Sequence, residues 1–172
     1  MPWRPSAVPT VADLAVERVT TPGQLAEAFA VRMAVFVAEQ QVPEELELDE
    51  LDHAPSTTHV VARRTGSGAV VGTARLLTDP AHPGEVHIGR VAVCADARGA
   101  GAGAALMRAL EDVALAEHPA PDGTVTVLLS AQVQAIGFYE RLGYDVSGPV
   151  YLDAGIDHRD AVKVLTGHAP QG

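Results

Sequence analysis

The sequence predicts an α/β fold, in which helices flank a mixed central sheet of about six or seven strands. Two observations carry this prediction. Short segments rich in apolar and β-branched residues alternate along the chain with segments whose apolar residues follow helical spacing. A glycine-rich turn at residues 98–103 separates a first group of strands from a β-α-β-β series. With 172 residues and no dividing linker, the chain is expected to form one domain with its own core.

The elements before the glycine-rich turn follow from alternation and from helix-start signals. Residues 12–19 alternate as a strand does, and Thr21-Pro22 is typical of an N-cap followed by proline at the first helical position. Apolar residues then keep helical spacing to about Glu39. An acidic loop is expected over residues 41–57, and three strands follow it. Their ranges are 58–64, 69–77 and 85–93, the first two joined as a hairpin across 65–68.

The elements after the turn begin with an alanine-rich helix that ends before Pro119. The apolar run at 124–129 is typical of a buried strand, and a helix over 135–142 is closed by Gly143, a common C-cap residue. Two closing strands, 146–152 and 161–165, are expected to be antiparallel. The domain is predicted to span residues 12–166, with tails at 1–11 and 167–172.

Composition narrows the classes of partner. The 22 acidic and 12 basic residues give a formal net charge of −10, which repels nucleic-acid phosphates and anionic lipid but suits a cationic substrate. The single cysteine, Cys94, allows no internal disulfide and makes a zinc cluster unexpected, so no metal is predicted. Residues 1–10 do not resemble a signal peptide, and no run reaches the roughly 18 apolar residues of a membrane helix. A cytoplasmic protein is therefore expected.

The turn from Arg98 to Gly103 is a candidate anion-binding site. Its alternate glycines let the backbone turn tightly and present successive N–H groups at the start of a helix. The helix dipole and these N–H groups favour a phosphate or pyrophosphate, and Arg98 adds a positive charge. A plain strand-to-helix turn without a ligand is the alternative.

Two other phosphate-binding motifs compete for this turn. A P-loop needs Lys and Ser/Thr where Ala104 and Ala105 stand, which excludes a nucleotide triphosphatase. The spacing of Gly99, Gly101 and Ala104 does satisfy the dinucleotide-binding fingerprint. However, that motif belongs after the first strand of its fold, and it requires an acidic residue at the end of the next strand. Here it lies past mid-chain, and the next strand ends in Leu129-Ser130, so the context disfavours a dinucleotide.

Two ordered motifs resemble signatures of the GNAT superfamily of N-acetyltransferases. The segment Val91-Ala92-Val93 … Arg98-x-x-Gly101-x-Gly103 resembles its acetyl-CoA signature. The segment Gln132-x-x-Ala135-x-x-Phe138-Tyr139-x-x-x-Gly143-Tyr144 is similar to N-x-x-A-x-x-x-Y-x-x-x-G-F, with Gln132 in place of Asn and Tyr144 in place of Phe. The resemblance covers about residues 12–165.

Three further segments resemble the ElaA-like branch of that superfamily. They are Arg32-x-x-Val35-Phe36-Val37-x-Glu39-Gln40 followed by Asp49, Asp52 and His59; Ile88-Gly89-Arg90-Val91; and Gly155-Ile156-Asp157-His158. The last is similar to the branch's G-I-P-H, with Asp157 in place of proline.

The resemblance implies a GNAT fold, in which the sheet splays between its fourth and fifth strands and the pantetheine arm of acetyl-CoA lies in the gap. The backbone of Val91 and Val93 would pair with the pantetheine amides, and the turn would hold the pyrophosphate. The residues expected to bind coenzyme A are Val91, Ala92, Val93, Arg98, Gly99, Ala100, Gly101, Ala102, Gly103, Ala104, Gln132 and Tyr139.

An acyltransferase that acetylates the primary amine of a small molecule or peptide also needs an acid and a base. By resemblance, Tyr139 would protonate the leaving thiolate. His87, on the fourth strand, and Glu39, at the end of the early helix, are alternative bases. Residues that could contact the acceptor are Arg32, Glu39, Gln40, His59 and His158. For each, a plain structural role is the alternative.

Two other functions stay open at this point. A non-catalytic acyl-CoA-binding module would keep the glycine-rich turn without needing Tyr139 or a base, and a dinucleotide-binding protein is the less favoured alternative. The sequence does not identify the acceptor, and it does not distinguish a monomer from a homodimer.

Overall fold

The computed structural model describes residues 13–167 and confirms the mixed α/β fold. Its seven strands are hydrogen-bonded in the order β1-β2-β3-β4-β5-β7-β6. Two compact units can be distinguished: one comprises residues 13–75 and 90–110, the other residues 76–89 and 111–167. The chain passes between them three times, within β3, β4 and α3, so no single linker separates them. The predicted N-terminal tail at 1–11 lies outside the described residues, as does the predicted C-terminal tail at 167–172 apart from Gly167.

The strands and helices have the following bounds. The strands are β1 Leu14–Arg18, β2 Thr58–Arg64, β3 Val70–Thr78, β4 Glu85–Val93, β5 Thr124–Gln132, β6 Asp145–Asp153 and β7 Ile156–Thr166. The α-helices are α1 Pro22–Arg32, α2 Glu44–Glu47, α3 Ala102–Glu117 and α4 Ile136–Arg141. A π-helix, Met33–Glu39, continues α1, and 3₁₀ turns lie at Glu50–His53, Ala95–Ala97 and Val133–Ala135.

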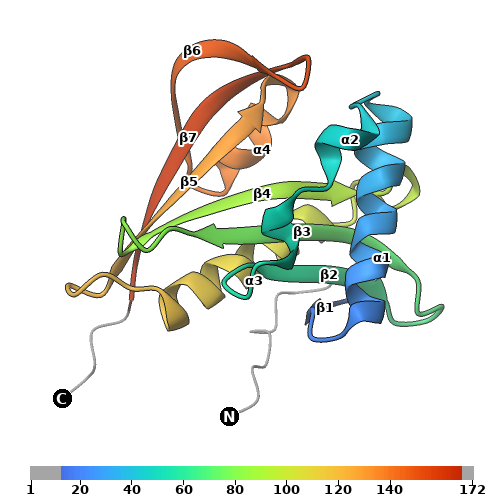
Figure 1. The fold of residues 1–172 in the computed structure, drawn as a ribbon, viewed down its shortest axis with the longest axis horizontal. Helices are drawn as coiled ribbons and strands as arrows, with labels where there is room; N and C mark the ends of the chain where they lie inside the picture. Colours follow the sequence, from blue (N-terminus) through green and yellow to red (C-terminus); the bar gives the residue numbers. More distant parts are fainter. Residues whose placement is uncertain (1–12, 168–172) are drawn as a thin grey trace. The chain divides into compact units, whose positions relative to one another are not determined.

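The first unit is built around β2, whose residues from Thr58 to Ala62 are buried. Thr21 caps α1 through a reciprocal capping box with Gln24, with Pro22 at the first position, as predicted. Helix α1 packs against β2 (Figure 1). Arg63 of β2 forms ion pairs with Glu27 of α1, which places the odd-numbered residues of β2 toward α1.

The other face of this unit meets α3. A Cβ added to Gly72 of β3 would lie 3.0 Å from Leu106 of α3 and 3.5 Å from Ala62 of β2. The absence of a side chain at Gly72 therefore lets α3 approach the sheet closely. The core between them contains the fully buried residues Val60, Ala62, Ala74 and Leu106.

The second unit contains the strands β5, β7 and β6, which run antiparallel side by side (Figure 1). Strand β4 pairs with β5 in parallel, from Glu85–Thr126 to His87–Leu128. These three pairs make up the described ladder, although β4 continues to Val93 and β5 to Gln132.

Three expectations about elements need correction. Residues 41–57 are not a plain loop, because α2 and the 3₁₀ turn lie within them, the latter capped reciprocally by Asp49 and Asp52. Strand β5 continues to Gln132, and β7 begins at Ile156 rather than at 161. The polar start of β7 has little strand propensity, and it is held extended by pairing with β5 from His158 onward.

Candidate active site

The glycine-rich turn leads from β4 into α3, as predicted. Gly99 and Gly101 have φ angles of 86° and 83°, in the left-handed region that favours glycine. The backbone N–H of Ala105 donates to the carbonyl of Gly101 at 3.0 Å, so the helical bonding starts there and the preceding N–H groups lack intrahelical acceptors. A Cβ added to Gly99 would meet no atom within 4 Å, so the space beside the turn is open. This geometry fits an anion such as a pyrophosphate.

Arg98 connects this turn to the end of the π-helix. Its Nη2 donates to both carboxylate oxygens of Glu39 at 2.8 Å, and its Nε donates to the carbonyl of Val93 at 3.0 Å. The structure thus brings together the expected pyrophosphate ligand and one expected base. Both side chains are partly exposed, so a bound anion could compete with Glu39 for the guanidinium.

The end of β4 is irregular at Arg90, whose φ of 51° is in the left-handed region although it is not glycine. Its guanidinium donates to the carbonyl of Glu47 at 3.2 Å and lies 3.3 Å from the Glu47 carboxylate. His87, on the same strand, is exposed.

A buried charge cluster holds the acidic segment 47–52 in place. Arg32 is 1% exposed; its Nε donates to Glu47 at 2.9 Å and its Nη1 to Asp52 at 2.6 Å. Arg75 donates from Nη1 to Asp49 and Asp52, each at 2.8 Å. Arg32 was expected to contact the acceptor, but its guanidinium already has partners on this segment. These contacts tie residues 47–52 to the end of α1.

The charges of this cluster shift the pKa values of its carboxyl groups. Burial alone would raise the pKa of Asp52. Hydrogen bonds from Arg32, from the backbone N–H of Asp49 and from Arg75 outweigh this effect and lower the pKa to about 2. Burial raises the pKa of Glu47, because its partners offset the loss of solvent only in part. Asp52 is therefore the ionised centre of the cluster.

Two other expected acceptor residues, His59 and Gln40, lie in the same unit. His59 is 5% exposed; its Nε2 is 3.1 Å from the carbonyl of Asp52, and its ring meets the edge of Phe29. Burial lowers the pKa of His59, which favours the neutral ring. Its Nδ1 is buried and has no hydrogen-bond partner among the described residues. Gln40 is half-buried at the end of the π-helix.

Tyr139 lies on α4 in the second unit and is 8% exposed. Its ring packs edge-on against Phe138 and Tyr144, with centroid distances of 5.0 and 6.0 Å. The hydroxyl of Tyr144 in turn donates to Glu111 at 2.7 Å. Burial raises the pKa of Tyr139 to about 12. The phenol therefore stays protonated at neutral pH, as a proton donor must.

The end of β5 and the start of β7 bring Gln132 opposite His158. His158 is 8% exposed, and its Nδ1 lies 2.7 Å from the carbonyl of Ile156. Its ring lies nearly parallel to that of Tyr151, at 21° and a centroid distance of 6.1 Å. Ser130 and Asp160, which flank this pair, were not among the expected site residues. Only the true start of β7 would have placed them beside His158.

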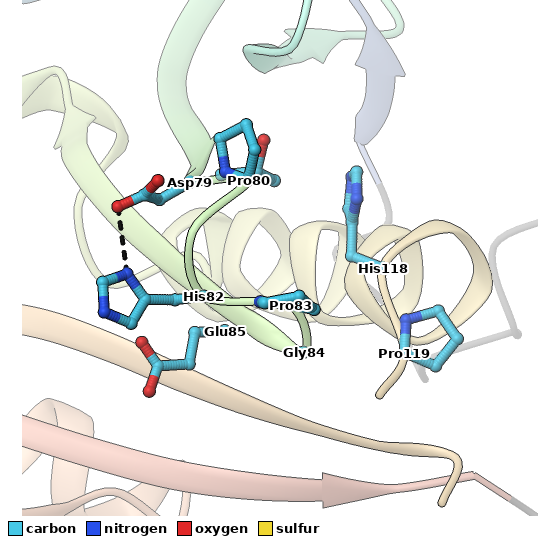
Figure 2. A pocket seen from close by; sticks show the side chains of 9 residues that line it. Asp79, Pro80, His82, Pro83, Gly84, Glu85, His118 and Pro119 are labelled. Atoms are coloured by element: carbon cyan, nitrogen blue, oxygen red, sulfur yellow. Dashed lines mark hydrogen bonds and ion pairs between the residues drawn. The ribbon is translucent and has the colours of Figure 1, made fainter. Parts of the chain in front are cut away.

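A shallow cavity of about 260 Å³ lies elsewhere in the second unit, between the β3–β4 connection and the end of α3. Figure 2 shows Asp79 and His82, 3.0 Å apart and hydrogen-bonded, among the side chains that line it. None of the expected cofactor or acceptor residues lines this cavity. It is therefore not the candidate active site.

The described residues provide neither a metal cluster nor a membrane-spanning helix. Within residues 13–167, no three or more His, Cys, Asp or Glu side chains gather as a metal ion would require. None of the helices in this range combines the length and the apolar character needed to cross a bilayer.

Comparison with known proteins places this geometry in a family. The chain is 38% identical to an uncharacterised N-acetyltransferase, YjcF of Bacillus subtilis, over 81% of this chain and 92% of the relative. The solved structure of Escherichia coli ElaA covers 87% of this chain and 99% of its own, with 26% identity and a TM-score of 0.76. An acyl-CoA N-acyltransferase from Pseudomonas aeruginosa covers 88% and 98%, with 32% identity and a TM-score of 0.71.

The match to ElaA confirms the expected branch. Residues 25–144, which contain the glycine-rich turn and Tyr139, match the family described as "Acetyltransferase (GNAT) family". The protein is therefore an acyltransferase that belongs to the GNAT family of acetyltransferases.

Proposed function

We propose that the protein transfers an acetyl group from acetyl-CoA to the primary amine of a small molecule or peptide. The observation that carries this proposal is the turn at residues 98–103, where left-handed Gly99 and Gly101 precede α3 and Arg98 stands beside them. Family membership supports an acyl-CoA donor and an amine acceptor. The acetyl group and the kind of acceptor are part of the proposal.

The donor would be held by the first unit. The N–H groups at the start of α3 and the guanidinium of Arg98 would receive the pyrophosphate, and the backbone of Val91 and Val93 would pair with the pantetheine amides. Arg98 would exchange Glu39 for the phosphates, keeping its bond to the carbonyl of Val93. Small residues at 99–104 leave room for this approach.

Acetyl-CoA supplies a carbonyl already activated as a thioester. The chain must polarise that carbonyl, accept a proton from the amine and donate one to the leaving sulfur. A backbone N–H of β4 would stabilise the negative charge that develops on the carbonyl oxygen. Tyr139, which burial keeps protonated, would donate to the sulfur.

Neither base expected from the sequence is oriented for its step in the structure. Glu39 would have to leave its ion pair with Arg98 to accept a proton. His87 is exposed, and the described residues form no hydrogen bond that would fix its ring. Both remain proposals, which the pH dependence of variants can decide.

The proposal is tested by ligand-induced thermal stabilisation with acetyl-CoA and, in parallel, NADH. Acetyl-CoA alone is expected to raise the melting temperature. Gly101→Val should abolish this shift, because a β-branched residue at φ 83° is strained and fills the space a pyrophosphate needs. Gly66→Val is the matched control, since a side chain at Gly66 meets nothing within 4 Å.

Three results would change the assignment. Stabilisation by NADH alone would support dinucleotide binding. Unchanged acetyl-CoA binding by Gly101→Val would contradict the pyrophosphate site. Binding by the parent protein without release of thiol in the presence of any amine would support a non-catalytic acyl-CoA-binding module.

A further inference from the structure

We infer that Arg90 is a positioning residue for the acyl end of the donor, and that it acts by holding the backbone of β4 in a left-handed conformation. Its guanidinium is anchored on residues 46–49, and this anchor carries the inference. The inference rests on the proposed function, because it concerns the strand along which acetyl-CoA would lie. Every residue that carries it belongs to the first unit.

The course of the donor along β4 brings its acyl end to Arg90. In the proposed function, the pyrophosphate lies at residues 98–103 and the pantetheine amides pair with Val93 and Val91. The donor therefore runs back along the strand, toward lower residue numbers. A short cysteamine link separates the last amide from the thioester, and Arg90 is the next residue after Val91 in that direction. The thioester carbonyl would thus lie beside the backbone around Arg90.

The backbone of Arg90 has a conformation that its residue type disfavours. Among residues 13–167, three residues other than glycine have a positive φ: Gln41 at 60°, Arg90 at 51° and Ala154 at 50°. Gln41 and Ala154 are exposed and lie between elements, whereas Arg90 lies inside β4. A regular strand residue has a φ of about −120°, so the peptide groups next to Arg90 point in directions that a regular strand does not give them. A strained residue of this kind persists only where its surroundings hold it.

The side chain of Arg90 supplies contacts that can hold this conformation. Its Nη2 donates to the carbonyl oxygens of Glu47 at 3.2 Å and Leu46 at 3.4 Å. Its Nε lies 3.3 Å from the carboxylate of Glu47, and its Nη2 lies 3.6 Å from that of Asp49. Oxygen atoms of one short segment thus surround the guanidinium. A return of residue 90 to a regular strand conformation would redirect its side chain and withdraw it from these partners.

The anchor itself is fixed independently of Arg90. Arg32 donates from Nη2 to the carbonyl of Glu47 at 2.7 Å and from Nε to its carboxylate at 2.9 Å. Arg75 donates from Nη1 and Nη2 to the two carboxylate oxygens of Asp49, at 2.8 and 2.9 Å. Arg32 and Arg75 are both buried. Residues 47–49 therefore form a firm support for Arg90, and removal of the Arg90 side chain should leave that support in place.

A fixed backbone at residue 90 matters because the thioester carbonyl must meet its hydrogen-bond donor in the right place. Preorganised N–H groups stabilise the charge that develops on the carbonyl oxygen, and they do so only from the correct position. A displacement of about 1 Å can lower a reaction rate by about 10²-fold. Arg90 itself would exchange no proton and contact no reacting atom. It would determine where the backbone N–H groups of β4 lie.

The test compares variants that differ in whether residue 90 can adopt a positive φ without its anchor. Glycine adopts this conformation freely and asparagine tolerates it, whereas alanine does not. Arg90→Gly and Arg90→Asn should therefore align the donor better than Arg90→Ala. A residue that only stabilised the fold would give the opposite order for glycine and alanine, because glycine weakens a strand.

The alignment is measured by the ¹³C resonance of acetyl-CoA labelled at its carbonyl carbon, since a hydrogen bond to the carbonyl shifts this resonance. The shift on binding should be largest for the parent, smaller for Arg90→Gly and Arg90→Asn, and lost for Arg90→Ala. The Kd of acetyl-CoA, from calorimetry, should change by less than about threefold, because such a bond contributes mainly in the transition state. Turnover with any amine that releases thiol should fall by up to about 10²-fold in Arg90→Ala.

Ala154→Gly is the matched control, since Ala154 also has a positive φ but is exposed and lies between β6 and β7. This variant should keep the resonance and the Kd of the parent. Far-ultraviolet circular dichroism checks that each variant is folded. If Arg90→Ala is not folded, Arg90→Ser replaces it, because serine likewise disfavours a positive φ.

The outcomes separate this inference from the proposed function. A parent protein that does not bind acetyl-CoA overturns the proposed function and the inference with it. Binding by the parent without a shift of the carbonyl resonance overturns the inference alone. So does an equal loss of the shift in Arg90→Gly and Arg90→Ala, which would mean that the guanidinium acts on the donor directly and not through the backbone.

Discussion

Asp52→Asn removes the negative charge from the centre of the buried cluster that orders the acidic segment. In the parent protein, Asp52 accepts hydrogen bonds from Arg32 and Arg75 and is itself fully enclosed. Asparagine has nearly the same shape, so the packing survives while the charge is lost. The guanidinium groups of Arg32 and Arg75 then lose the carboxylate charge that offsets their own buried positive charges.

Two routes give the expected magnitude. The pKa of Asp52 is about 2 in the folded protein. Against about 3.9 for an unfolded aspartate, that difference is worth about 2.5 kcal/mol of stability at pH 7. Removing one partner of a buried ion pair costs about 3–5 kcal/mol by general experience. The variant is therefore expected to lose about 3 kcal/mol in the free energy of unfolding.

The same linkage fixes the pH dependence. A carboxyl group with a depressed pKa stabilises the fold above its unfolded pKa, and this stabilisation is lost as pH falls from about 4 toward 2. Asp49, whose pKa Arg75 also lowers, adds to this acid loss, whereas the raised pKa of Glu47 opposes it. The stability difference between parent and Asp52→Asn should therefore shrink between pH 5 and pH 2.5.

The assay is urea-induced unfolding followed by far-ultraviolet circular dichroism at pH 7, 5 and 3. Asp145→Asn, an exposed carboxylate, serves as the control and should change the free energy of unfolding by less than about 0.5 kcal/mol. A loss below about 1 kcal/mol for Asp52→Asn at pH 7 would refute the cluster's structural role. So would a difference from the parent that stays constant down to pH 3.

Two further predictions concern catalysis. Tyr139→Phe should lower kcat about 10²–10⁴-fold with little change in acetyl-CoA affinity, because it removes only the proton donor; an unchanged kcat at saturating acceptor would exclude this role. Glu39→Gln should lower the Kd of acetyl-CoA about two- to fivefold, because a partly exposed ion pair worth up to about 1 kcal/mol no longer occupies Arg98. Calorimetry and steady-state kinetics would check it, and a large loss of kcat would instead favour Glu39 as the base.

Local signals predicted much of the fold. The strands at 58–64 and 85–93 have the bounds that alternation indicated, and the capping box at Thr21 starts α1 where expected. These elements can be predicted from the sequence because the residues that define them are neighbours in the chain. The glycine-rich turn was found for the same reason, since its conformation depends on its own glycines.

The missed features depend on contacts between distant residues. The acidic segment reads as a solvated loop, because its counter-ions Arg32, Arg75 and Arg90 lie 15 to 43 residues away from their partners in the sequence. The start of β7 is polar, and only its pairing with β5 makes it a strand. Without that register, nothing in the sequence sets Asp160 beside Tyr151.

The π-helix from Met33 to Glu39 has a consequence for how this chain can change by insertion and deletion. Its i to i+5 bonding, seen in the bond from the N–H of Gln40 to the carbonyl of Val35, accommodates one more residue per turn than an α-helix would. Deleting one residue here could restore α-helical bonding and leave the buried side chains before it undisturbed. Because the wider turns of a π-helix absorb the extra residue locally, the side chains after it keep the direction they would have in an uninterrupted α-helix. Glu39 would therefore stay beside Arg98. A deletion of one residue in this segment is thus expected to spare the ion pair beside the glycine-rich turn.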